Sequence, residues 1–209
     1  MPLDLPDQLA ARLARTLPGS RAQAKQQPEL SYGRHFHSAP AGVRQAAVMA
    51  LLYRDQGGWR FPLVIRPRSM AAHAGQISLP GGVIDPDETD REAAQRELEE
   101  ELGVPPAGVR LLGRLSTLHL FVTQFEITPW VASIDARPLW HPSPAEVSQL
   151  LEVPLDCLAD PTCYGHHVRG KRGVQFLAPH IQCGPHHIWG ATAMILAELA
   201  AVLDDLHSS

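Results

Sequence analysis

Residues 82–104 read GVIDPDETDREAAQRELEEELGV, and this stretch decides the fold of the chain. Its first nine residues are rich in Gly, Pro and Asp, which indicates a loop. From Arg91 to Leu102 there is no Gly, Pro or β-branched residue, so this part favours a helix. Thr89 or Asp90 is the expected N-cap, and Gly103 stands where a left-handed cap would end the helix. The stretch therefore predicts a loop followed by a capped helix.

Three glutamates of this predicted helix share one face. At about 100° per residue, Glu97 and Glu101 project about 40° apart, and Glu100 lies about 60° the other way. Like charges at this spacing destabilise a helix by a few tenths of a kcal/mol per pair. A hard divalent cation would relieve this repulsion, since Mg²⁺ takes oxygen ligands and completes its shell with water and substrate phosphate. The pattern predicts a Mg²⁺ or Mn²⁺ site for attack on a phosphate chain.

The composition of the whole chain bounds its class and partners. With 209 residues, one domain with a real core is expected. The net charge of −4 argues against nucleic-acid binding, which usually shows a basic surplus. We find no apolar run long enough to cross a membrane and no secretory signal pattern, so no membrane partner is expected. Three cysteines without paired metal spacing favour free thiols and a cytoplasmic protein. A monomer or a homodimer is expected, and the sequence does not decide between them.

The chain divides into an N-terminal helix and arm at 1–40, packed on a main domain at 41–209. In order, the sequence predicts a helix at 3–16, a hairpin of strands at 45–53 and 59–65, a short strand at 76–79, strands at 109–118 and 120–132, a short helix at 143–151, a basic loop at 164–173, a strand at 174–178 and a terminal helix at 187–206. Strands followed by flanking helices predict a layered α/β domain.

The quoted stretch resembles the Nudix box, Gly-x5-Glu-x7-Arg-Glu-U-x-Glu-Glu-x-Gly-U, in which U is a bulky aliphatic residue. Every fixed position matches: Gly82, Glu88, Arg96, Glu97, Leu98, Glu100, Glu101, Gly103 and Val104. A solvated acidic helix face would explain the acidity but not this joint spacing. The resemblance implies the Nudix fold, an α/β/α arrangement in which helices sandwich a mixed β-sheet and the box forms a loop-helix-loop.

Segments outside the box resemble the coenzyme A diphosphatase branch of the Nudix hydrolases. They are RPRS at 66–69, HAGQ at 73–76, SLPGG at 78–82, PAEV at 144–147, VPL at 153–155 and IWGATA at 188–193. The resemblance covers roughly residues 44–206 and implies hydrolysis of coenzyme A to 4′-phosphopantetheine and adenosine 3′,5′-bisphosphate. Two positions depart from the pattern: Leu79 replaces a Phe, and the Arg that often precedes His73 is absent.

The resemblance also implies roles for the box residues. Glu97 and Glu101 are the expected primary metal ligands, with Glu100 as the third ligand directly or through water. Arg96 would pair with Glu88 or hold a glutamate in position. A general base is also needed, and the candidates are a box glutamate or a carboxylate outside the box.

Glu146 is the best base candidate outside the box, although a plain role in the first turn of a helix is an equal alternative. Glu126 is a weaker candidate for the base. The expected substrate contacts come from Arg66, Arg68, His73, Gly81 and Gly82. Arg34, Arg66 and Arg68 are also candidates to replace the absent arginine.

Two other functions remain open at this point. One is a Nudix pyrophosphatase for ADP-ribose, NADH or nucleoside triphosphates, and the other is a nucleotide-sensing Nudix module without turnover. The paired histidines at 166–167 and 186–187 are expected to be surface or loop residues rather than a zinc site, because adjacent residues of a strand point apart. Trp189 is expected to anchor the last helix in the core rather than to stack on a base.

Overall fold

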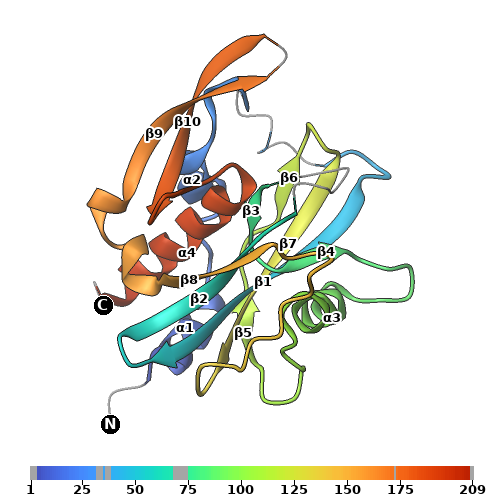
Figure 1. The fold of residues 1–209 in the computed structure, drawn as a ribbon, viewed down its shortest axis with the longest axis vertical. Coiled ribbons are helices and arrows are strands. Elements are labelled where there is room, and N and C mark those ends of the chain that lie inside the picture. Colours follow the sequence, from blue (N-terminus) through green and yellow to red (C-terminus); the bar gives the residue numbers. More distant parts are fainter. Residues whose placement is uncertain (1–3, 32–34, 36–38, 68–74, 172, 208–209) are drawn as a thin grey trace.

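The computed structural model describes residues 4–31, 35, 39–67, 75–171 and 173–207. A mixed sheet of eight strands forms its centre, in the order β3-β2-β1-β7-β5, with β4 on β1, β6 on β7 and β8 on β2 (Figure 1). The strands are β1 (Arg44–Asp55), β2 (Gly58–Ile65), β3 (Ile77–Ser78), β4 (Gly81–Val83), β5 (Arg110–Arg114), β6 (Leu118–Leu120), β7 (Phe125–Ile134) and β8 (Gln149–Pro154). Among the strand pairs of the described residues, β1 and β7 are parallel and the remaining pairs of this sheet are antiparallel.

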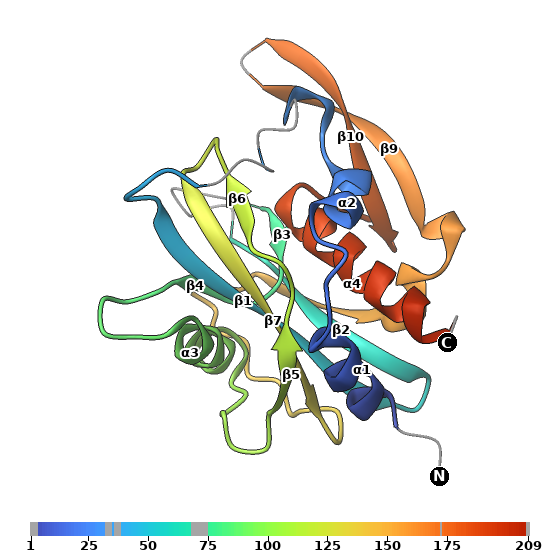
Figure 2. The same cartoon turned by 180° about the vertical axis from the view of Figure 1, so that it is seen from behind.

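Helices cover both faces of this sheet, as the two opposite views show (Figure 1, Figure 2). Helix α3 (Asp90–Leu102) packs on one face, and α1 (Leu5–Leu13) and α4 (Ala191–His207) lie on the other. Side chains of β1 alternate between the two cores: Met49 and Leu51 face α3, whereas Ala50 and Leu52 face the opposite core. The predicted α/β/α layering is confirmed. No helix of the described ranges is both long and apolar enough to span a membrane.

Helix α3 begins and ends where local sequence signals place it. Thr89 is its N-cap, and Thr89 and Glu92 form a reciprocal capping box. Gly103 ends the helix in the left-handed conformation, with φ of 71°. Leu98 and Leu102 are buried in the core beneath the sheet. The apolar side of α3 thus packs on the sheet, and the glutamates of its acidic side point away from this core.

Three expectations about the C-terminal half are wrong. The expected basic loop is strand β9 (Tyr164–Lys171), which pairs with β10 (Val174–Cys183). The last helix starts at Ala191, because the preceding residues form β11 (His186–Trp189) on β10. The short helix expected at 143–151 is a turn followed by β8, which pairs with β2. Of these three cases, only β8 shows a long-range pairing, with β2, that overrides the local pattern. Strands β9, β10 and β11 are consecutive hairpin strands, and their short turns were not recognised in the sequence.

Smaller differences occur between α3 and the small sheet. The strand expected at 109–118 is two short strands, β5 and β6, and β7 begins only at Phe125. Two 3₁₀ turns, η4 (Leu155–Leu158) and η5 (Pro161–Cys163), connect β8 to the small sheet. This small sheet has the order β11-β10-β9, and its hairpin extends away from the central sheet (Figure 1).

The N-terminal segment is built into the main core. Leu9 and Leu13 of α1 are buried in the same cluster as α4. Beyond α1 come α2 (Ser20–Gln23) and the 3₁₀ turns η1 (Ala24–Gln26) and η2 (Glu29–Ser31). The buried carboxylate of Glu198 on α4 accepts hydrogen bonds from the Gly19 backbone N–H and the Gln23 side chain, both at 2.9 Å. A division of the chain at residue 40 stays a prediction.

Candidate active site

Three carboxylates meet where the acidic side of α3 faces the turn before β8. Glu97, Glu101 and Glu146 each offer one oxygen, and these oxygens lie within 4.8 Å of one another. Glu146 reaches the pair because its turn is fastened to the end of α3: the Ser143 N–H donates to the Glu101 backbone carbonyl at 2.9 Å. The Val147 N–H then donates to the Ser143 carbonyl and closes the turn. Backbone hydrogen bonds therefore position all three carboxylates together.

Glu101 is the most buried of the three. Its side chain is 1% exposed, and it accepts hydrogen bonds from Arg66 Nη2 at 3.1 Å and from the Gly81 N–H at 3.2 Å. Burial raises the pKa of Glu101 to about 8, against the lowering effect of Arg66 and of the Gly81 N–H. Repulsion from Glu97 and Glu146 is a smaller contribution to this raised pKa. A cation beside this group would stabilise its ionised form.

Arg96 organises the exposed side of the cluster. Its Nε and Nη2 atoms donate to the two oxygens of Glu88 at 2.9 and 3.0 Å, a bidentate pair. Its Nη1 atom donates to both Glu97 and Glu100 at 3.0 Å. The hydrogen bond from Arg96 lowers the pKa of Glu88, whereas burial raises that of Glu97. Arg96 thus makes both contacts that the sequence analysis gave as alternatives, with Glu88 and with glutamates of the cluster.

Gly82 lets the carboxylate of Glu97 lie against the backbone of β4. A Cβ atom on Gly82 would be 2.2 Å from Oε1 of Glu97. The neighbouring Gly81 approaches β1 as closely, since its Cβ would be 2.3 Å from the Ala47 carbonyl oxygen. Both glycines therefore reflect close approach of the backbone rather than a flexible loop, and they form a short strand instead of the predicted loop.

A pocket of about 860 Å³ lies over the cluster. Its polar end is lined by the charged residues Arg66, Arg96, Glu97, Glu100 and Glu146. Its apolar walls include the aromatic residues Phe121, Phe125, Phe176 and Trp189. Pro28, Leu30 and Ser31 from the N-terminal segment complete it. A pocket of this size and mixed lining suits a small organic ligand with one strongly anionic part.

The structure brings together some predicted residues and separates others. Glu146 joins Glu97 and Glu101, so its alternative role in a helix turn is wrong because no helix forms there. The side chain of Glu100 is 52% exposed and pairs with Arg96 beside the cluster. Glu126 accepts a hydrogen bond from Gln45 and lines another pocket.

Arg66 lies at the site, where its guanidinium contacts Glu101 and the Gly81 carbonyl. Arg34, Arg68 and His73 lie outside the described residues. Trp189 is partly exposed in the pocket wall, 4.4 Å beneath the guanidinium of Arg169, rather than in the core. The aromatic wall was not predicted, since its members are dispersed in the sequence and share no spacing signal.

The donor set of the cluster suits a hard divalent cation. All three ligand groups are carboxylates, and Mg²⁺ and Mn²⁺ prefer oxygen donors. The Glu101 carboxyl has one cationic partner and two anionic neighbours, so a second cation would complete its charge balance. Glu97, Glu101 and Glu146 could therefore hold one such ion at the polar end of the pocket.

An α/β/α fold with three clustered carboxylates beneath a pocket is an arrangement suited to an α/β enzyme that uses a divalent metal ion. Within this class, residues 43–162 match the family model described as the NUDIX domain. Because that match spans more than half of the sequence, the chain belongs to the Nudix family. It is an enzyme, a Nudix pyrophosphohydrolase that acts on pyrophosphate bonds.

Curated relatives support the same assignment. The chain is 38% identical over 149 residues to a protein named uncharacterized Nudix hydrolase NudL from Pectobacterium atrosepticum, with 68% of this chain and 74% of that protein covered. It is 36% identical over 167 residues to a protein of the same name from Klebsiella pneumoniae strain 342, with 75% and 81% covered. These names report the family and leave the substrate open.

Solved structures share the fold. A Nudix hydrolase from M. smegmatis, RenU, matches with a TM-score of 0.53 and 19% identity, over 79% of this chain and 86% of that one. The MutT protein from Methanosarcina mazei Go1 matches with a TM-score of 0.51 and 19% identity, over 79% and 99%. At this identity the likeness concerns the fold alone.

Proposed function

We propose that this enzyme hydrolyses the pyrophosphate bond of coenzyme A or a derivative of it, with Mg²⁺ or Mn²⁺. The products would be 4′-phosphopantetheine and adenosine 3′,5′-bisphosphate. The observation that carries the proposal is the pocket, which joins the carboxylate cluster to an aromatic and apolar wall. Coenzyme A has a matching division, because its diphosphate lies between an aromatic base and an uncharged pantetheine arm.

The polar end of the pocket supplies the metal site of the proposal. When bound, a divalent ion neutralises phosphoryl oxygens and lowers the pKa of water. Glu97 and Glu101 are the proposed main ligands, and Arg66 holds Glu101 while Arg96 holds Glu97. Glu100 borders the same pocket and remains a proposed further ligand.

Glu146 is the proposed general base. Its carboxylate borders the pocket and lies within 4.8 Å of the ligand oxygens of Glu97 and Glu101. A base must lie within hydrogen-bond reach of the attacking water, directly or through one further water, and removing it lowers the rate by roughly 10²–10⁴-fold. We therefore expect Glu146→Gln to lower kcat by at least about a hundredfold. A much smaller loss, with KM for the metal raised instead, would assign Glu146 to metal binding alone.

A hydrolysis panel with products identified by mass tests the substrate. The panel contains coenzyme A, an acyl coenzyme A, ADP-ribose, NADH and nucleoside triphosphates, each with Mg²⁺, with Mn²⁺ and with chelator. We expect the highest kcat/KM for coenzyme A or its acyl form, and a loss of at least about a hundredfold in Glu101→Gln. A higher kcat/KM for another nucleotide would assign that substrate instead. Tight binding without hydrolysis of any compound would indicate a sensing module.

A further inference from the structure

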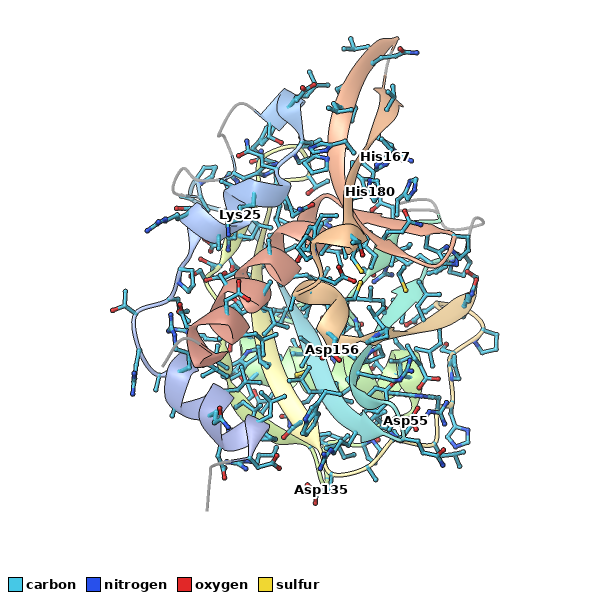
Figure 3. All side chains as sticks on the ribbon, turned by 90° about the vertical axis from the view of Figure 1, so that its left-hand side faces the viewer. Lys25, Asp55, Asp135, Asp156, His167 and His180 are labelled. Atoms are coloured by element: carbon cyan, nitrogen blue, oxygen red, sulfur yellow. The ribbon has the colours of Figure 1, made fainter. Side chains whose placement is uncertain are left out.

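Three histidines meet on the small sheet, one from each of its strands. They are His167 on β9, His180 on β10 and His187 on β11, and one ring nitrogen of each lies within 4.8 Å of the others. Nδ1 of His167 is 3.1 Å from Nδ1 of His180. The rings of His180 and His187 stack with centroids 4.0 Å apart. Figure 3 shows His167 and His180 on the adjacent strands of the hairpin.

The strand register places these side chains on one face of the small sheet. His180 lies opposite Gly165 on β9, and His167 is two residues further along that strand. On the other side, His180 lies opposite Trp189 on β11, and His187 is two residues before it. Residues two apart on a strand share a face of the sheet. All three histidines therefore point to the same face.

Gly165 leaves room for the central ring. A Cβ atom at Gly165 would be 2.9 Å from Cε1 and 3.0 Å from Nε2 of His180. The His180 ring thus packs against bare backbone, and the residue is only 6% exposed. His187 is exposed and His167 is partly exposed. The cluster therefore has one buried ring, that of His180, and is open to solvent on the side of His187.

The surroundings of His167 and His180 favour the neutral imidazole. Burial lowers the pKa of both His167 and His180, and the charge of His187 lowers each further. Across the described ranges, no ion pair joins a carboxylate to any of the three rings. A neutral imidazole keeps one nitrogen lone pair free, which is the form that binds a metal ion.

We propose that His167, His180 and His187 form a second metal site, specific for a borderline transition-metal cation such as Zn²⁺ and separate from the carboxylate centre. Imidazole nitrogen suits Zn²⁺, Ni²⁺ or Cu²⁺, whereas Mg²⁺ prefers oxygen donors. Ligand nitrogens of a tetrahedral zinc site are about 3.3 Å apart at the usual Zn–N length. The His167–His180 pair is already close to this spacing. The exposed ring of His187 has to turn out of its stack to bind, and water would take the fourth position.

The proposed site would brace one wall of the main pocket. Trp189, which lies opposite His180 in the register, also lines that pocket, and its ring is 6.1 Å from that of His167. Phe176 lies four residues before His180 on β10, so its side chain points to the same face of the sheet, and it lines the pocket as well. An ion that fastens the three strands would therefore restrain both aromatic side chains.

Metal titration of the full-length, metal-free protein tests the proposal. Zn²⁺ is titrated by calorimetry with excess Mg²⁺ present, so that the carboxylate centre is already supplied with its preferred ion, and Co²⁺ absorption reports the coordination geometry. We expect one Zn²⁺ per chain with micromolar or tighter affinity and the visible bands of four-coordinate Co²⁺. His180→Ala and His187→Gln should each weaken Zn²⁺ binding at least tenfold.

His166→Gln is the matched control, since His166 is exposed and lies on the opposite face of β9. It should bind Zn²⁺ as the parent does. His187→Gln guards against a folding defect, because His187 is an exposed residue and its replacement should leave the thermal midpoint without zinc unchanged. No Zn²⁺ uptake in the presence of Mg²⁺, or equal uptake by the parent and both cluster variants, would overturn the site. Neither result bears on coenzyme A hydrolysis, which is measured separately.

Discussion

At the scale of single residues, Glu101 shows how the fold creates reactivity. An ionised carboxylate that is almost fully buried is destabilised unless it is paired and hydrogen-bonded. Arg66 and the Gly81 N–H offset part of that effect, yet the pKa of Glu101 still rises to about 8 because burial dominates. Arg66, expected as a substrate contact, is therefore proposed as a residue that positions a metal ligand.

Gly82→Ala tests whether close backbone approach sets the position of Glu97. The new Cβ would overlap the Glu97 carboxylate, which is the movable end of a flexible side chain. We expect kcat/KM to fall at least about tenfold and the Mg²⁺ concentration needed for half-maximal activity to rise. The unfolding free energy should change by less than about 1 kcal/mol. Gly57→Ala, in the β1–β2 turn, is the control, since its Cβ would make only ordinary contact with Arg60 at 3.5 Å. Unchanged Mg²⁺ dependence in Gly82→Ala would contradict this role.

At the scale of elements, local signals determine α3 but not the turn that carries Glu146. The cap at Thr89 and the end at Gly103 depend on neighbouring residues, so they could be predicted from the sequence. The position of Glu146 depends on a hydrogen bond between Ser143 and Glu101, which are far apart in the sequence. The register of β9, β10 and β11 is set by short hairpin turns, since Lys171 pairs with Val174 and Cys183 with His186. The sequence pattern indicated a loop in place of β9 and the start of a helix in place of β11, so neither the pocket wall nor the histidine cluster was predicted.

Thr89→Ala tests the capping box of α3. Thr89 Oγ1 accepts from the Glu92 N–H, and the Glu92 carboxylate accepts from the Thr89 N–H at 2.9 Å. Removing the hydroxyl should lower the unfolding free energy by about 1 kcal/mol, measured by urea denaturation at pH 7. Thr89→Ser should remain close to the parent, and Thr117→Ala controls for loss of an exposed threonine outside helices. A loss in Thr89→Ala no larger than in the control would show that the cap contributes nothing.

At the scale of the whole molecule, the two cores share one sheet, and the pocket draws on segments from both halves of the chain. The N-terminal segment lines the pocket through Leu30 and is tied to α4 through Glu198. Helix α3 contributes Glu97 and Glu101 from the opposite layer, and the turn before β8 contributes Glu146. Global unfolding therefore removes the site as a unit, and the stability of the sheet is directly relevant to function.

Glu152→Gln tests how a single carboxylate on β8 makes the stability of the whole molecule depend on pH. Glu152 accepts from both Arg137 nitrogens at 2.7 Å, from Tyr53 Oη at 2.6 Å and from Trp140 Nε1 at 2.9 Å. The Arg137 hydrogen bonds in particular lower the pKa of Glu152 to about 2. Because this value is below that of the unfolded chain, the contribution to stability is present above about pH 4.5 and is lost as the pH falls towards 2. The unfolding free energy, measured by urea denaturation, should be higher in the parent than in Glu152→Gln by about 2–3 kcal/mol at pH 7 and by much less near pH 2. Glu99→Gln, at an exposed site, is the control, and its unfolding free energy should differ little from that of the parent at either pH. A difference between parent and Glu152→Gln that stays constant across this range would contradict the assignment of the pH dependence to Glu152.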